Sequence, residues 1–305
     1  MRIVVMGAGG VGGYFGGRLA QAGFPVTFIA RGAHLAAMRA HGLGLRSALG
    51  DATIHVRAVG DPAEAGKADV VLFAVKLWDT ETAAVLLKPV LAENGVVVPF
   101  QNGVESIERI GAVLGAERVM GGVAYIAARI AEPGVIAHTG KIARLRIGAA
   151  CPSQQAAAQA LQAACGTSGF ETEVTDDIRR ALWEKFVFLV GMSGATALSR
   201  LPIGPIREDA QLRWLLEAAM RETWTVARAR GIDLPEDFVS RQMELVAGFP
   251  PGTKSSMLGD LEAGAKLELP WLAGAVVRMA QDHGLEVPVN RTILAALTPF
   301  AGGRP

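Results

Sequence analysis

Hydrophobic positions follow two different patterns in the two halves of this 305-residue chain. In the first half, short continuous apolar runs rich in β-branched residues alternate with amphipathic stretches; the runs lie at residues 2–6, 24–30, 69–75 and 95–100. Such runs are typical of parallel strands covered on both faces by helices. The pattern therefore predicts a parallel α/β domain over residues 1–175.

Strand signals nearly vanish in the second half, where apolar residues recur with helical spacing between caps and prolines. The predicted helices span residues 177–198, 208–230, 236–248, 256–264, 270–283 and 290–297. We therefore expect an all-helical domain over 176–305, with a disordered tail at 301–305. At the end of the first domain, residues 119–148 predict short antiparallel strands that extend its sheet, followed by a helix at 153–165 and a strand at 170–174.

A glycine-rich turn follows the first apolar run directly and opens a helical stretch. Its pattern is Gly7-x-Gly9-x-x-Gly12, with Gly10 between the second and third glycines. In dinucleotide sites these glycines permit a tight turn, close approach of a pyrophosphate and packing of the helix on the strand. An ordinary glycine-rich turn is the alternative in a chain with 37 glycines. The position after a strand favours a Rossmann-type cofactor site.

The residue at the end of the second strand bears on the choice of cofactor. An acid commonly binds the ribose 2′-hydroxyl of NAD there, whereas this chain has Arg31. A guanidinium can pair with the 2′-phosphate of NADP(H) through its planar fork. The alternative is a solvent-exposed arginine at a helix start. The sequence thus favours NADP(H) over NAD(H).

Composition narrows the class of protein. The formal net charge is +1 and the sequence has no run of lysines and arginines, which argues against nucleic acid as a partner. The two cysteines have no metal-ligand spacing and no metal site is expected. No targeting segment precedes the first strand, so we expect a cytoplasmic protein. The longest apolar run, residues 186–199, is shorter than the ~20 residues of a membrane span, so no membrane partner is expected.

Candidate chemistry lies at strand ends and in the helical half. Lys76 and Asn102 follow two buried strands, at the edge where open α/β sheets bind ligands, although each alone could be a loop residue. Lys185 interrupts an apolar helix, so its side chain either reaches outward or is held partly desolvated as a proton donor. The hydroxyls at 253–256 form either a helix cap or a carboxylate site. Glu268 alone would be an unremarkable surface acid.

Taken together, these motifs resemble the ketopantoate reductase (2-dehydropantoate 2-reductase) family over the whole chain. The motifs, in order, are the turn at 7–13, Arg31, Val75-Lys76, Gln101-Asn102-Gly103-Val104, Trp183-x-Lys185, Ser255-Ser256-Met-Leu-x-Asp260, Glu268, Gly274-Ala-Val-Val and Val287-Pro-Val-Asn290. The resemblance implies a Rossmann-type domain, a helical C-terminal domain like that of 6-phosphogluconate dehydrogenase, and NADPH-dependent reduction of 2-dehydropantoate to pantoate.

Site roles follow from the same resemblance. It makes Lys185 the general acid, places Glu268 beside the cofactor to position that lysine, and gives Asn102 contacts with cofactor and substrate. The cofactor residues it implies are Gly7, Gly9, Gly10, Gly12, Arg31, Lys76, Asn102, Ala128 and Glu268. The substrate residues are Asn102, Lys185, Leu189, Ser193, Thr253 and Ser256.

The chain departs from the family pattern at substrate positions. Leu189, Ser193, Thr253 and Ile203 stand where family members carry asparagines that hydrogen-bond the substrate. These departures favour a second hypothesis, an NADPH-dependent reductase of a less polar 2-oxo acid. A non-catalytic NADP(H)-sensing protein is a third, against which the pair Lys185 and Glu268 argues. Three tryptophans of the helical half, Trp214, Trp224 and Trp271, would suit either a homodimer surface or the core.

Overall fold

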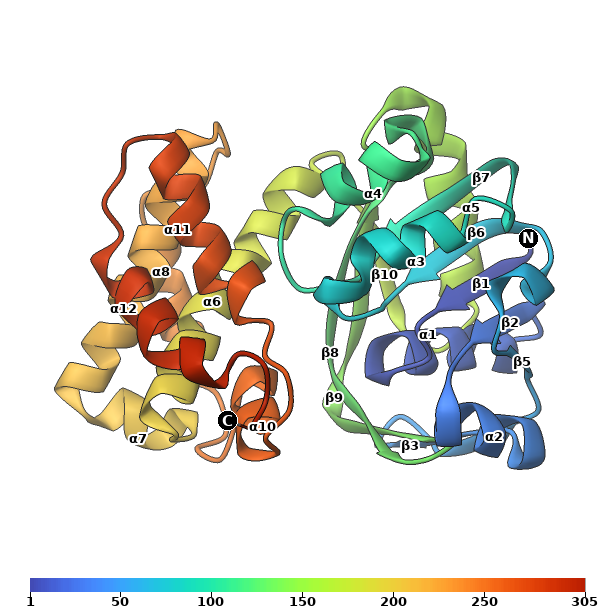
Figure 1. Ribbon diagram of the computed structural model, residues 1–305, viewed down its shortest axis with the longest axis horizontal. Helices are drawn as coiled ribbons and strands as arrows, with labels where there is room; N and C mark the ends of the chain where they lie inside the picture. Colours follow the sequence, from blue (N-terminus) through green and yellow to red (C-terminus); the bar gives the residue numbers. More distant parts are fainter. Residues whose placement is uncertain (305) are drawn as a thin grey trace. The chain divides into compact units, whose positions relative to one another are not determined.

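The computed structural model describes residues 1–304, which divide into two compact units (Figure 1). The first comprises Met1–Gln101 and Glu105–Ala181. The second comprises the short segment Asn102–Val104 and the chain from Leu182 onward. The boundary expected after residue 175 lies shortly before this division and stays a prediction.

A five-stranded parallel sheet forms the centre of the first unit. Its strands are β1 (Ile3–Met6), β2 (Val26–Ile29), β5 (Arg57–Val59), β6 (Ala68–Phe73) and β7 (Leu91–Pro99), in the order β5-β2-β1-β6-β7. Alternate residues of β1 enter two different apolar clusters, Ile3 and Val5 one and Val4 and Met6 the other. Both faces of the sheet are therefore covered, as the continuous apolar runs predict. The predicted Rossmann-type fold is confirmed.

The chain leaves β1 in one direction for β2 and later returns beside β1 on its other side as β6. Such a reversal of strand order opens a crevice at the carboxyl ends of the strands. The helices of this unit are α1 (Gly10–Gln21), α2 (Gly32–His41), α3 (Thr80–Leu86), α4 (Ser106–Leu114) and α5 (Gln155–Gly166). The N-terminus of α1 lies at that crevice because the glycine turn joins it directly to β1.

A second sheet lies in the same unit. It contains β3 (Leu43–Ser47), β4 (Ala52–Ile54), β8 (Gly121–Glu132), β9 (Val135–Gly148) and β10 (Glu171–Val174). The antiparallel pairing expected over 119–148 is present as the long β8–β9 hairpin. The expectation that it extends the parallel sheet is wrong, because β9 pairs instead with β3 and β10.

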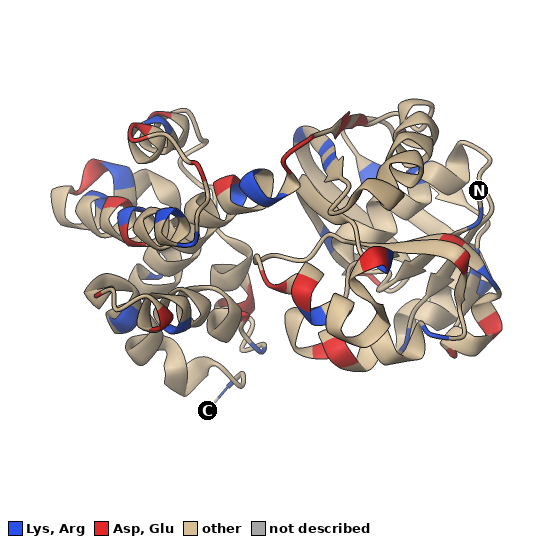
Figure 2. Cartoon of the chain, turned by 90° about the horizontal axis from the view of Figure 1, so that it is seen from above, with Lys and Arg blue, Asp and Glu red and all other residues tan. Residues whose placement is uncertain are grey.

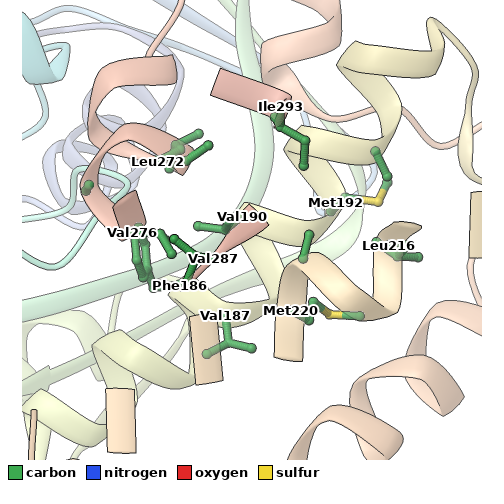
Figure 3. Packing of buried hydrophobic residues seen from close by; sticks show 14 of the residues in the cluster. Phe186, Val187, Val190, Met192, Leu216, Met220, Leu272, Val276, Val287 and Ile293 are labelled. Atoms are coloured by element: carbon green, nitrogen blue, oxygen red, sulfur yellow. The ribbon is translucent and has the colours of Figure 1, made fainter. Parts of the chain in front are cut away.

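Seven helices make up the described part of the second unit. They are α6 (Ile178–Ser199, which begins in the first unit), α7 (Ile203–Glu208), α8 (Ala210–Ala229), α9 (Phe238–Ala247), α10 (Ser256–Glu262), α11 (Ala273–Asp282) and α12 (Pro288–Leu297). Figure 3 shows Phe186 and Val190 of α6 near Val276 of α11, and Met192 near Leu216 of α8. The predicted all-helical domain is confirmed, with α6 as the helix that its neighbours cover.

The chain end is ordered up to Arg304. Leu267 N–H donates to the Ala301 carbonyl and Arg304 N–H to the Gly264 carbonyl, both at 3.0 Å. The expectation of disorder is therefore wrong for residues 301–304, because these backbone bonds tie the segment to the turn after α10. The remaining residue of that expectation, Pro305, lies outside the described residues.

Candidate active site

The glycine turn between β1 and α1 has a geometry that side chains would block. Gly7 has φ of +99°, and a Cβ there would lie 2.8 Å from the backbone of Ala74 and Val75. A Cβ on Gly12 would lie 2.2 Å from the Gly7 carbonyl oxygen. Glycine is therefore required at both positions, one for the turn and one for packing of α1 on β1.

Gly9 differs from these two glycines because space is open above it. A Cβ at Gly9 would meet no other heavy atom of the described chain within 4 Å. The first N–H groups of α1 have no partner within the helix, so they are available to an anion. An open backbone turn at a helix N-terminus fits the pyrophosphate of a dinucleotide.

The β8–β9 hairpin lies against the same helix N-terminus. A Cβ on Gly10 would lie 2.1 Å from the Ala128 carbonyl oxygen of β8. Ala128, an expected cofactor residue, is thus brought to the glycine turn from more than a hundred residues away in the chain. Arg31 is exposed at the N-terminus of α2, just after β2. Lys76 follows β6 and lies over the Trp78 ring, with Nζ 5.6 Å from the ring centroid.

Gln101 and Asn102, at the end of β7, belong to different units. Gln101 is 8% exposed, and its Nε2 donates to the Val75 carbonyl at 3.0 Å and to Thr80 Oγ1 at 2.9 Å. These bonds fasten the end of β7 to the end of β6 and the start of α3. This role of Gln101 is absent from the predicted site, and its place after a strand end is the signal for it in the sequence.

Asn102 lies between the two residues expected to carry the chemistry. Lys185 Nζ donates to Asn102 Oδ1 at 3.1 Å, and Asn102 Nδ2 donates to Glu268 Oε2 over a long 3.5 Å. The amide orientation follows from charge, since its oxygen faces the ammonium and its NH₂ faces the carboxylate. The second unit therefore brings together Lys185, Asn102 and Glu268.

Burial lowers the pKa of Lys185 to about 8, and the negative charge of Glu268 partly opposes this shift. Glu268 is itself only 8% exposed, so its charge acts in a medium of reduced polarity. An ammonium with a pKa near 8 is protonated at neutral pH and can release its proton readily. Of the two interpretations of Lys185, partial desolvation applies, because its Nζ is bonded to Asn102 and its pKa is lowered.

Further residues of α6 lie on the same helix face as Lys185, and they include both polar and apolar side chains. Leu189 is half-buried, one turn on, whereas Ser193 is fully buried and its Oγ has no hydrogen-bond partner in residues 1–304. Thr196, also fully buried, pairs with Ser255 Oγ at 2.6 Å. Thr196 is absent from the predicted site, although its spacing from Lys185 and Ser193 places it on the same helix face.

The hydroxyls at the start of α10 have separate places. Ser255 caps the helix, because its Oγ accepts a hydrogen bond from Leu258 N–H at 3.1 Å. Of the two alternatives for these hydroxyls, the helix cap is therefore the one that Ser255 forms. Ser256 is exposed at the first helical position and Thr253 is half-buried just before it. Ile203 is fully buried in the apolar cluster of the second unit. Of these expected or departing positions, only Ser256 presents an exposed hydroxyl.

Comparisons with known proteins cover nearly the whole chain. Residues 3–151 match the family described as "Ketopantoate reductase PanE/ApbA", and residues 177–301 match "Ketopantoate reductase PanE/ApbA C terminal". The chain belongs to the ketopantoate reductase family. This confirms the resemblance that the motifs indicate and makes the protein a dinucleotide-dependent oxidoreductase acting on a CH–OH group.

Similar proteins come from several organisms. A 2-dehydropantoate 2-reductase of Halobacterium salinarum is 35% identical over 96% of both chains. An uncharacterized oxidoreductase, YkpB, of Bacillus subtilis is 30% identical over 98% of this chain and 99% of its own. The crystal structure of a PanE/ApbA family ketopantoate reductase from Ralstonia eutropha JMP134 has a TM-score of 0.91 at 36% identity, covering 99% and 98% of the two chains.

Charge distribution, potential metal ligands and long apolar helices bear on the remaining expectations from the sequence. In the view of Figure 2, lysines and arginines are interspersed with acids on both units. Residues 1–304 contain no group of three or more His, Cys, Asp or Glu that could hold a metal ion. One helix, α6, is long and apolar enough to cross a membrane, but 67% of its most apolar window is buried inside the structure.

Proposed function

We propose that this protein catalyses the NADPH-dependent reduction of 2-dehydropantoate to pantoate, with Lys185 as the general acid. The observation that carries the proposal is the Lys185–Asn102–Glu268 constellation, in which half-buried Lys185 and Asn102 meet buried Glu268 and the pKa of Lys185 is lowered to about 8. Membership of the ketopantoate reductase family supports the reaction class.

The proposed chemistry assigns a role to each of the three side chains. Bound NADPH supplies a hydride to C2 of the 2-oxo acid. Lys185 stabilises the negative charge that develops on the ketone oxygen and then donates a proton to it. Asn102 holds the ammonium through its Oδ1, and Glu268 keeps the pKa of Lys185 from falling further. The exposed hydroxyl of Ser256 is proposed to bind the substrate.

For the cofactor we propose NADP(H), held by residues of the glycine turn and of nearby strand ends. The helix N-terminus at Gly9 and Gly10 would bind the pyrophosphate, and Arg31 the 2′-phosphate. No acid stands at the end of β2 to bind a ribose 2′-hydroxyl instead. Lys76 and the backbone at Ala128 complete this proposed site.

A less polar 2-oxo acid is the second candidate substrate, and α6 favours it. Leu189 places an apolar side chain one turn from Lys185, and Ser193, beyond it, is withdrawn from solvent. Ile203 is a core residue. At three of the four positions that depart from the family pattern, therefore, no accessible side chain can form a hydrogen bond with a hydroxyl of the substrate.

Steady-state rates with NADPH on 2-dehydropantoate and on a panel of branched 2-oxo acids test these alternatives. A higher kcat/KM for 2-dehydropantoate supports the first proposal; a higher value for an alkyl 2-oxo acid supports the second. Leu189→Asn sharpens the test, because an amide there should raise kcat/KM for 2-dehydropantoate by about tenfold relative to an alkyl substrate. No turnover of any 2-oxo acid would overturn both.

We also propose that the protein is cytoplasmic and homodimeric. Trp214 on α8 is 59% exposed, whereas Trp224 is partly buried and its Nε1 donates to the Pro235 carbonyl at 3.0 Å. A dimer would cover Trp214, a large apolar side chain that a monomer leaves in water. Light scattering of the protein and of Trp214→Glu tests this: the variant should be monomeric if Trp214 lies in the interface.

A further inference from the structure

His34 connects the second helix of the first unit to the turn of the β8–β9 hairpin. It is the third residue of α2, and its Nδ1 accepts a hydrogen bond from Gly134 N–H at 2.9 Å. Gly134 has φ of +82° and lies between β8 and β9. Because a backbone N–H can only donate, Nδ1 must be unprotonated, and the neutral ring carries its proton on Nε2.

Burial holds His34 in this neutral form. It lowers the pKa of the ring, and an interaction with the Ala8 carbonyl partly opposes the shift. Nε2 is buried. Ala8 lies between Gly7 and Gly9 of the glycine turn, so one imidazole ring is adjacent to both that turn and the hairpin.

The position of the hairpin matters because β8 and β9 form one wall of the glycine turn. The Ala128 carbonyl oxygen lies so close to Gly10 that a Cβ there would be 2.1 Å away, and Ile136 lies within 2.8 Å of a Cβ on Gly13. Gly134 is held from a second direction, since its carbonyl accepts from Gly44 N–H of β3 at 2.8 Å. A shift of the hairpin would therefore change the space available at the N-terminus of α1.

We propose that His34 is a positioning residue for the dinucleotide: through its bond to Gly134 it holds the β8–β9 hairpin in the place that leaves the glycine turn open to the pyrophosphate. The inference rests on the proposed cofactor role of the glycine turn. His34 takes no part in hydride or proton transfer. Its substitution should therefore weaken cofactor binding and leave kcat at saturating NADPH nearly unchanged.

Three substitutions separate the hydrogen bond from the volume of the ring. His34→Asn places an amide oxygen where Nδ1 stands and keeps the acceptor for Gly134. His34→Gln is polar and of similar length but carries its amide further out, and His34→Leu has no acceptor. We expect the Kd for NADPH, from quenching of protein fluorescence, to rise about tenfold in the Gln and Leu variants and less than about threefold in the Asn variant.

Amide exchange in the cofactor-free protein provides a readout that does not depend on activity. Exchange across residues 132–136 should accelerate in the Gln and Leu variants and return toward the parent rate in the Asn variant. The turn at Gly115, whose N–H is bonded to the Gly111 carbonyl within α4, should not change in any of them.

Unchanged Kd and unchanged exchange in the Gln variant would overturn the inference, as would an Asn variant as weak in binding as Gln at equal thermal stability. Gly9→Ala distinguishes failure of the inference from failure of the proposed function. If Gly9→Ala weakens NADPH binding and His34→Gln does not, only the role of His34 is wrong. If Gly9→Ala has no effect either, the glycine turn is not the cofactor site.

Discussion

The glycine turn and the Lys185 constellation are built in opposite ways. The turn consists of backbone: its requirements are the φ of Gly7, the contact of Gly12 with the Gly7 carbonyl and the open space above Gly9. The constellation consists of side chains, and its two hydrogen bonds join residues 83 and 166 positions apart in the chain.

This difference decides how each region tolerates change. A backbone site within one turn is lost when any atom is added to it, whereas a side-chain site fails when one functional group is removed. The turn should thus be sensitive to small additions such as a methyl group. The constellation should be sensitive to the loss of an ammonium or carboxylate.

The largest effect is expected from Lys185→Ala. Loss of the general acid should lower kcat for reduction by about 10²- to 10⁴-fold, while the Kd for NADPH stays within about twofold. Lys254→Ala is the matched control, because Lys254 is an exposed lysine of the same unit paired with Glu262. Steady-state kinetics and fluorescence titration measure the two quantities. Undiminished turnover of the best substrate would make the proposed mechanism wrong.

Arg31→Asp should act on the other region alone. Replacing the guanidinium by a carboxylate at the end of β2 should weaken NADPH binding about 100-fold, through loss of charged hydrogen bonds to the 2′-phosphate. NADH, which has no 2′-phosphate, serves as the internal control and should lose little affinity. Equal losses for the two cofactors, measured by titration, would refute the 2′-phosphate role.

Gly9→Ala tests whether the space above the turn is kept open for a ligand. Gly9 has φ of −75°, so alanine is compatible with its backbone and the melting temperature should not change. Binding of NADPH should weaken about 10- to 100-fold because the methyl group obstructs the phosphate. In Gly12→Ala, by contrast, the melting temperature should fall as well, since that Cβ meets the Gly7 carbonyl. A destabilised Gly9→Ala would contradict the open-space argument.

The smallest effect is expected in the pH profile. The pKa of Lys185 is lowered to about 8, so the donor is protonated at pH 7 and is lost as the pH rises through that value. We expect kcat/KM for reduction to fall about tenfold per pH unit above the break. Glu268→Gln removes the charge that raises this pKa, so the break should move to lower pH. If the pH at which kcat/KM begins to fall does not change in this variant, Glu268 does not act on Lys185 electrostatically.

Local signals predicted much of the fold. The parallel strands β1, β2, β6 and β7 and the helical second half follow from apolar runs and periodicity that a few neighbouring residues display. The sequence does not predict the short strands β3, β4 and β5, because each is stabilised by pairing: β3 with β9, which is distant in sequence, β4 with β3, and β5 with β2. For the same reason the β8–β9 hairpin was assigned to the parallel sheet rather than to a second one.

The candidate site, too, is predictable where its geometry is local and not where it depends on distant segments. Gly7, Gly9 and Gly12 can be inferred from spacing alone, since the geometry they permit is contained within one turn. Asn102 was recognised at a strand end, yet its place between Lys185 and Glu268 could not be inferred from that strand. Thr196 shares the helix face of Lys185, but its bond to Ser255 depends on another segment, and His34 has no local signal because its role depends on Gly134.

By itself, therefore, the sequence determined a dinucleotide turn and a lysine unusual in its apolar helix, and Arg31 led to the prediction of NADP(H). Only the tertiary structure decided that this lysine is held by Asn102 with its pKa lowered to about 8, and that Ser193 and Ile203 are withdrawn into the core. The physical reason is that backbone geometry is set by adjacent residues. Desolvation and charge, in contrast, depend on every segment that packs around a group.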